Sequence, residues 1–302
     1  MPGLGRVLAD LPSGVAISVA VHLPQILLTA MAWRVLLPPG RRPGLAAMAQ
    51  LRWFRESANA LLPAGALVGQ AAAARLLARR GVPGEMAGAT ATVDLTLEAV
   101  SQLVFTLAGI GLLLAGGADR AMASLAVAGL GVAALGAFAM VLAQRHLGPL
   151  EALLRLLARR WPALRPEWIG ELQQAVRRLH TDRGALVAAL LWHGAAWVLG
   201  AVEIMGVLGL LGHPVSLADA LVIESLAQAL RNVGFMLPGA LAVQEGAIIG
   251  AAALVGVPPA AALAAALIRR TREVAFGLPG LVAWHRSEVT GARARIARRG
   301  PG

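Results

Sequence analysis

Residues 224–246 read ESLAQALRNVGFMLPGALAVQEG and place charged and amide side chains on both sides of Pro238. Long apolar stretches flank this segment on either side. Inside a bilayer, charges and non-helical backbone are tolerated only where protein or a water-filled cavity surrounds them. The segment therefore predicts a membrane-embedded helix that is broken at Pro238 and faces a polar interior.

The composition supports a membrane protein. Of the 302 residues, 58% are hydrophobic and 14% are charged, and the mean hydropathy is +0.69. Soluble domains average about 25% charged residues. A helix needs about 20 apolar residues to cross a bilayer, and several stretches reach or exceed this length. We predict an all-α polytopic membrane protein with spans at 14–37, 85–116, 120–143 and 184–211.

The charge and the missing residue types exclude several function classes. The formal net charge is +11, and it comes from Arg because the chain contains no Lys. Nucleic-acid binding is one reading of such a charge. The Arg residues lie mainly between the spans, where the positive-inside rule places them, so we expect no nucleic-acid partner. Without Cys or Lys, the chain has no thiolate metal site and no phosphate-binding G-x-x-x-x-G-K-[ST] motif. No cofactor is expected.

The sequence also contains an internal repeat. A gap-free shift of 175 residues places LLPAGALVGQ (61–70) on MLPGALAVQE (236–245) and Gly-Val-Pro (81–83) on the same triplet at 256–258. The same shift places Glu98 on Glu273. Chance matching of Ala-rich sequence is the alternative, but it does not explain these pairs. We predict two repeats, each with a re-entrant helical hairpin broken at Pro63 or Pro238.

The charge distribution predicts how the repeats are oriented. Residues 145–183 contain eight Arg and four acidic residues, and the tail from Arg286 contains five Arg and one Glu. Both segments should therefore be cytoplasmic. With these two segments placed in the cytoplasm, the order of the spans makes the first span run from outside to the cytoplasm. Its counterpart in the second repeat then runs from the cytoplasm to the outside. Inverted repeats with broken helices are typical of secondary transporters, whose binding sites lie at the breaks.

Four regions follow from this topology. The first repeat and a connecting span occupy 1–144, and a basic amphipathic cytoplasmic connection occupies 145–183. The second, inverted repeat occupies 184–285, and a basic cytoplasmic tail occupies 286–302. The two Arg-rich segments should contact the anionic cytoplasmic leaflet, where each Arg gains about 1 kcal/mol. A solvated pair of linker helices is the alternative for the connection.

Polar residues concentrate around the two breaks. An acid or Arg at the centre of a membrane helix costs about 2.5–3.5 kcal/mol on insertion scales. Buried ion pairs that only hold helices together are the alternative, but such pairs often lose to apolar packing. A cluster of this size therefore favours binding. The predicted substrate-binding residues are Arg55, Glu56, Asn59, Gln70, Asp94, Glu98, Glu224, Arg231, Asn232, Gln244, Glu245, Arg269 and Glu273.

The chemistry of these residues suits a polar head group. Arg captures phosphate or carboxylate with two parallel hydrogen bonds, and carboxylates hold amines or hydroxyls. The helix N-termini after Pro63 and Pro238 add partial positive charge. The repeat shift places Glu56 on Arg231 and Asp94 on Arg269, so we expect these opposite charges to pair across the repeat axis.

Three further features have simpler interpretations. His22 and Pro24 are read as a kink with a packed histidine, and Trp192 and Trp197 as packing residues. Glu203 lies on the same span as the two tryptophans and is a weaker candidate for the cavity.

These segments resemble the transmembrane region of lysylphosphatidylglycerol synthases and related flippase-like proteins. The resemblance rests on RESANALLPAGALVGQAAAARLLARRGVP (55–83), ATVDLTLEAVSQLVF (91–105), ESLAQALRNVGFMLPGALAVQEGAI (224–248) and ALIRRTREVAFGLPGL (266–281). It covers roughly 45–285 and is nearest to the bacterial branch associated with hopanoid biosynthesis. The family often has Pro-Gly-Gly-x-Gly before the acid, whereas this chain has Pro-Gly-Ala-Leu-Ala at 238–242.

The resemblance implies a bacterial inner-membrane protein that moves lipids between leaflets. Synthase members add a soluble aminoacyl-transferase domain, whereas this chain ends in a short Arg-rich tail, so we do not expect synthase activity. We predict a lipid transporter for a hopanoid or an aminoacylated phospholipid, and not an enzyme. A scaffold for lipid-biosynthesis proteins and an intramembrane enzyme that uses Asp94 and Glu98 are the alternatives. A homo-oligomer is a further expectation.

Overall fold

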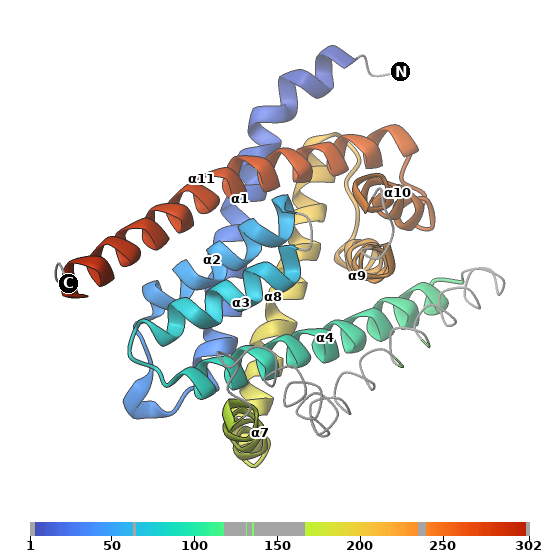
Figure 1. Cartoon of the computed structure of the whole chain (residues 1–302). Helices are drawn as coiled ribbons and strands as arrows, with labels where there is room; N and C mark the ends of the chain where they lie inside the picture. Colours follow the sequence, from blue (N-terminus) through green and yellow to red (C-terminus); the bar gives the residue numbers. More distant parts are fainter. Residues whose placement is uncertain are drawn as a thin grey trace.

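A computed structural model of the chain describes residues 4–62, 65–117, 167–234 and 240–299, together with 131 and 135. All regular structure in these residues is helical, which confirms the predicted all-α fold (Figure 1). The α-helices are α1 (Leu4–Val35), α2 (Leu45–Leu61), α3 (Gly65–Ala78), α4 (Gly84–Ala115), α7 (Glu167–Leu179), α8 (Arg183–Leu210), α9 (Leu217–Gly234), α10 (Ala240–Ala253) and α11 (Pro259–Arg299). A short 3-10 turn, Pro39–Arg41, joins α1 to α2.

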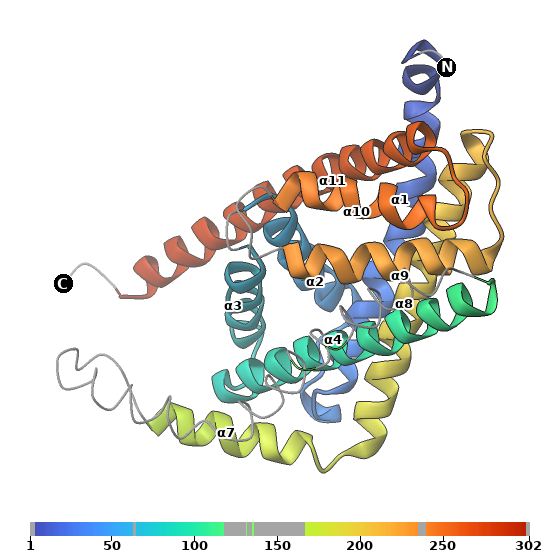
Figure 2. The ribbon, with the colours of Figure 1, turned by 90° about the vertical axis from the view of Figure 1, so that its right-hand side faces the viewer.

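Three helices in the described part of the chain are long and apolar enough to cross a membrane. They are Leu11–Val35 of α1, Gly84–Ala115 of α4 and Arg183–Leu210 of α8. They correspond to three of the predicted spans, and the fourth, at 120–143, lies outside the described residues. Helices α1 and α8 run antiparallel and in contact, while α4 and α11 cross them at a wide angle on opposite sides (Figures 1 and 2).

Each predicted broken segment consists of two helices. Helix α2 ends at Leu61, Leu62 has an extended backbone (φ −107°, ψ 143°), and α3 starts at Gly65. In the second half, α9 ends at Gly234 and α10 starts at Ala240. Proline favours such interruptions because it lacks an N–H and clashes with the preceding turn. Pro63 and Pro238 themselves lie outside the described residues. The helices pack as the pairs α2–α3 and α9–α10, and their re-entrant course in a membrane stays a prediction.

The two halves make matching contacts. Helix α1 packs on α2 as α8 packs on α9, and α3 packs on α4 as α10 packs on α11. Contacts between the halves also match, since α4 packs on α9 while α11 packs on α2. These pairings are what a two-fold relation between the halves predicts. The inverted orientation of the halves relative to a bilayer stays a prediction.

Helical structure is also present in the predicted connection and in the predicted tail. In the predicted connection, α7 buries Ala175, Val176 and Leu179 in a cluster with residues of α1, α4 and α8. Helix α11 continues past the predicted end of the second repeat at residue 285 to Arg299, so the predicted tail begins within a helix. Glu288 secures this extension, because its carboxylate pairs with Arg75 and with Arg79 (2.8 Å) of α3.

Candidate functional site

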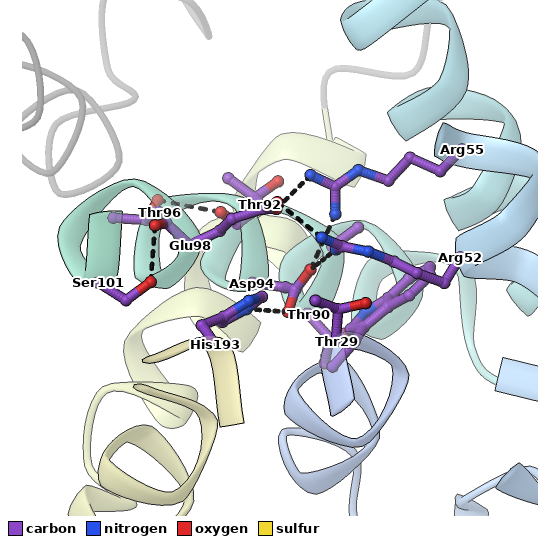
Figure 3. Close-up of polar contacts among 12 residues, drawn as sticks. Thr29, Arg52, Arg55, Thr90, Thr92, Asp94, Thr96, Glu98, Ser101 and His193 are labelled. Atoms are coloured by element: carbon purple, nitrogen blue, oxygen red, sulfur yellow. Dashed lines mark hydrogen bonds and ion pairs between the residues drawn. The ribbon is translucent and has the colours of Figure 1, made fainter. Parts of the chain in front are cut away.

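A first charged cluster joins α2 to α4. Arg52 and Arg55 of α2 each donate to Asp94 Oδ2, over 3.1 and 3.0 Å. The same two guanidinium groups donate to the two oxygens of Glu98, over 2.6 and 2.5 Å. Figure 3 shows both arginines reaching from α2 toward the face of α4 that carries the acids. The predicted shared face of Asp94 and Glu98 follows from their i, i+4 spacing.

The first cluster continues to α1 and α8 through two histidines. His193 Nε2 of α8 lies 3.0 Å from Asp94 Oδ1, with both side chains buried (Figure 3). Glu56 lies one turn after Arg52, pairs with it over 3.1 Å, and reaches His22 Nε2 of α1 at 3.2 Å. Four helices therefore contribute to one network.

Exposure separates inner from outer members of the first cluster. The side chains of Arg52 and Asp94 are 2% and 0% exposed, whereas those of Glu98 and Glu56 are 21% and 26% exposed. Removing one partner of a buried ion pair leaves the other charge buried without compensation, which is strongly destabilising. Arg52 and Asp94 therefore stabilise the fold together. The outer carboxylates are the ones that an incoming group can reach.

A second cluster lies between α9, α10 and α11. Arg269 of α11 donates a hydrogen bond to Glu224 Oε1 of α9 over 3.0 Å, and its other terminal nitrogen lies 2.8 Å from Glu224 Oε2. Arg269 and Arg272 also approach Glu203 of α8, at 3.6 and 3.4 Å. Glu203 in turn accepts a hydrogen bond from Ser18 of α1.

The accessible part of the second cluster surrounds Arg270. Its guanidinium pairs with Glu273 (2.9 Å) and Glu245 (3.3 Å), and Gln244 Nε2 donates to Glu273 (2.9 Å). Arg231 of α9 reaches Glu273 at 3.7 Å and has a side chain that is 32% exposed. Arg231 is therefore the most accessible group of this cluster, and Arg270 and Glu245 are equally exposed at 21%, whereas carboxylates are the most accessible groups of the first cluster.

The clusters approach each other where α1 crosses α8. Gln25 Oε1 of α1 accepts a hydrogen bond from His22 Nδ1 (2.9 Å), and Gln25 Nε2 donates to the carbonyl of Ala196 (3.0 Å). A Cβ at Gly200 would lie 3.2 Å from Gln25 Nε2 and 2.8 Å from a carboxylate oxygen of Glu224. The missing side chain at Gly200 lets both polar groups approach α8.

The structure brings most of the predicted residues together, but not all. Arg55, Glu56, Asp94 and Glu98 meet in the first cluster, and Glu224, Arg231, Gln244, Glu245, Arg269 and Glu273 meet in the second. Gln70 donates to the carbonyl of Ala91, and its Oε1 is buried without a hydrogen-bond partner. Asn59 is exposed at the end of α2, and the side chain of Asn232 lies outside the described residues.

The predicted pairing across the repeat axis is wrong. Glu56 pairs with Arg52 and His22, while Arg231 pairs with Glu273. Asp94 binds three groups, two arginines of α2 and His193, so it has no need of Arg269, which pairs with Glu224. In the described residues, each of these carboxylates pairs with an Arg of its own half, and His193 of α8 reaches Asp94 from the second half.

Sequence reasoning missed several members of these clusters. Arg52 is not among the predicted binding residues, although it lies at the centre of the first cluster. The i, i+4 spacing of Arg52 and Glu56 was an available signal. His22 packs edge-on against Phe276 as predicted, but the prediction missed its place in the first cluster, where both of its ring nitrogens have polar partners. His193 and Arg272 carry no local signal, since only the crossing of distant helices brings them in.

A pocket in the described structure lies away from these charges. It has a volume of about 290 Å³ and lies at the ends of α4, α9 and α10, between Leu112, Val222 and Leu254. None of the predicted site residues lines it. In the described part of the chain, no group of His and acidic side chains is arranged to hold a metal ion. A polar cavity between the two clusters stays a prediction.

Comparison with protein families agrees with this arrangement of helices and charges. The family model described as the lysylphosphatidylglycerol synthase TM region matches residues 3–279. The chain belongs to this family. The match includes α2, α4, α9 and the part of α11 that carries the charged residues, so both clusters lie within the family's region. Membership makes the chain a membrane protein of lipid biosynthesis or transport. Searches of curated proteins and of solved structures found no match.

Proposed function

We propose that the chain is a flippase that moves a polar-headed lipid between the leaflets of a bacterial inner membrane. The observation that carries this proposal is the pair of ionic clusters at two interrupted helical segments, packed against apolar helices long enough to span. Charged groups at membrane depth are expensive and mark ion and substrate pathways. Family membership supports a lipid as the substrate.

The exposed members of the clusters favour a head group with both donors and acceptors. Glu56 and Glu98 offer carboxylates to an amine or hydroxyl, and Arg231 and Arg270 offer guanidinium groups to a phosphate or carboxylate. The two substrate classes we propose are hopanoids with polar heads and aminoacylated phospholipids. We further propose that the C-terminus is cytoplasmic and that the chain carries out no chemical reaction itself.

Charge-neutral substitutions test the transport proposal. The purified protein is reconstituted into vesicles with a fluorescent lipid, and movement between leaflets is measured by chemical quenching from outside. Glu98→Gln and Arg231→Gln should each lower the rate at least about tenfold, which corresponds to about 1.4 kcal/mol of lost stabilisation. Glu171→Gln and Arg177→Gln, both exposed on α7, are matched controls that should keep the wild-type rate.

The outcomes separate transport from the two other function classes. A membrane scaffold would move no lipid in wild-type vesicles and would tolerate both substitutions wherever the protein still folds. An intramembrane enzyme would change the mass of the lipid rather than its leaflet, which mass spectrometry of the vesicles detects. Wild-type protein that neither accelerates movement nor alters the lipid contradicts the proposal.

A further inference from the structure

The two clusters differ in their charge balance. The second cluster opposes four guanidinium groups (Arg231, Arg269, Arg270 and Arg272) to four carboxylates (Glu203, Glu224, Glu245 and Glu273). The first opposes only Arg52 and Arg55 to the carboxylates of Glu56, Asp94 and Glu98. It therefore has one negative charge in excess. An uncompensated charge away from water is costly, so the first cluster needs one more positive charge.

Two histidines contact the first cluster, and their hydrogen bonds distinguish them. His193 Nε2 faces Asp94, but its Nδ1 is buried and has no hydrogen-bond partner. An imidazolium carries an N–H on both nitrogens, and a neutral ring carries one. A proton on Nδ1 would leave a buried donor unpaired, at a penalty of about 1–3 kcal/mol. The geometry therefore favours a neutral His193.

His22 has the opposite surroundings, because both of its ring nitrogens face acceptors. Nε2 lies 3.2 Å from Glu56 Oε2, and Nδ1 lies 2.9 Å from Gln25 Oε1. The orientation of the Gln25 amide follows from its other end, since Nε2 donates to the carbonyl of Ala196. A ring between two acceptors satisfies both only when both of its nitrogens carry protons.

The remaining neighbours of His22 do not supply the missing charge. On α8, Glu203 lies near enough to act on His22 electrostatically, and it has its own partners in Arg269 and Arg272. On α11, the neighbour is the ring of Phe276, edge-on at 5.3 Å. On α2, Arg52 pairs with Glu56, and its positive charge is already included in the charge balance of the first cluster.

We infer that His22 carries the proton that neutralises the first cluster, and that this proton is exchanged when the chain moves a lipid. The charge balance of the first cluster and the two acceptors around the His22 ring each support a protonated His22. Imidazole is the side chain suited to exchange, because its charge changes near neutral pH. The side chains of His22 and Glu56 are 14% and 26% exposed, so neither is fully enclosed by protein.

The exchange follows from the same charge balance. A head group that brings a positive charge to Glu56 or Glu98 would leave the cluster with one positive charge too many. The Nε2–H bond of His22 then breaks and an O–H bond forms at Glu56 Oε2. The carboxylic acid next gives this proton to water and takes up the ligand as a carboxylate. When the ligand leaves, a proton from water returns to Nε2.

The protonation state can be measured without any transport assay. The full chain is labelled with ¹⁵N at the histidine rings, placed in lipid nanodiscs at pH 7, and analysed by solid-state nuclear magnetic resonance. His22→Gln assigns the signals by their loss. We expect both ring nitrogens of His22 to be of the N–H type. A neutral tautomer in the wild-type protein would overturn the inference.

Glu56→Gln supplies a sharper test of the same idea. This change leaves two guanidinium groups against two carboxylates, so the cluster becomes neutral without a histidine proton. We expect the His22 signals to change to those of a neutral ring at pH 7. Glu171→Gln, on the exposed face of α7, should leave them unchanged. An imidazolium that persists in Glu56→Gln would contradict the charge-balance argument.

Coupling to lipid movement rests on the proposed function and needs vesicles with a pH difference across the membrane. In the wild type, the rate of movement should change with the direction of the difference. His22→Gln should lose this dependence, and His285→Gln, at an exposed position of α11, should keep it. A rate of lipid movement that does not depend on the pH difference contradicts the coupling to a proton but not the proposed flippase function. Absence of any movement by the wild type instead contradicts the proposed function.

Discussion

At the scale of single residues, Arg52 occupies the most constrained position of the first cluster. Its three guanidinium nitrogens each meet a different carboxylate, those of Glu56, Asp94 and Glu98. All three contacts form in a side chain that is 2% exposed. Arg suits this position because its planar fork holds several donors in fixed directions, which a Lys ammonium does not.

Replacing Arg52 should destabilise the protein. Arg52→Gln leaves the buried carboxylate of Asp94 with one arginine fewer, and breaking a buried pair costs about 3–5 kcal/mol. We expect a lower temperature of unfolding in detergent, measured by intrinsic fluorescence. Arg41→Gln, on the exposed turn between α1 and α2, should unfold at the wild-type temperature.

A double substitution checks the cause of this loss. In Arg52→Gln with Asp94→Asn, the stranded charge is removed together with its partner. Residues in one network have non-additive effects. We therefore expect the double variant to unfold at a higher temperature than the sum of the single losses predicts. Simple additivity would show that the pair has no special role.

At the scale of elements, close contacts between helices depend on small residues. The face of α4 meets α9 at Gly109, where a Cβ would collide with the side chain of Ser225. The corresponding contact between α11 and α2 places Gly280 against Ser57. Small residues are common at such crossings in membranes, because they let backbones approach closely.

Two glycines on α4 form a natural comparison. Gly109→Ala adds a methyl group at the contact with Ser225, and overpacking of this kind costs about 1–3 kcal/mol. Gly111→Ala adds the same group where nothing lies within 4 Å. The first variant should unfold at a lower temperature than the wild type. The second should match or exceed the wild type, since Ala favours helix over Gly. Equal temperatures for the two would argue against this helix crossing.

At the scale of the whole molecule, the antiparallel packing of α1 and α8 sets the arrangement of the two halves. The turn after α1 and the turn after α8 lie at opposite ends of this pair (Figure 1). In a membrane that both helices cross, these turns would face opposite compartments. The charge bias of the sequence places the first turn, PPGRRPG (38–44), in the cytoplasm.

Single cysteines can test this topology, because the natural chain has none. Arg41→Cys and His213→Cys introduce one thiol into each turn. A membrane-impermeant thiol reagent applied to intact cells should label His213→Cys and leave Arg41→Cys unlabelled. Inside-out vesicles should show the reverse pattern. Labelling of both positions from the same face would exclude inverted repeats.

The sequence by itself determined the helical membrane class, the two interrupted segments and the family. Each of these depends on local signals. Apolar length predicts a span, a proline predicts an interruption, and a constant offset between two motifs indicates a repeat. For the same reason, the shared face of Asp94 and Glu98 could be predicted from their spacing along one helix.

Only the tertiary structure decided which charges meet. Arg52 and Asp94 are 42 residues apart, and His193 is 99 residues from Asp94. The repeat offset predicted pairs between the halves, but the helices cross so that each acid meets the arginines of its own half. An ion pair requires atoms within about 4 Å, and that depends on crossing positions that no local pattern records. The place of His22 between two acceptors is a result of the same crossings.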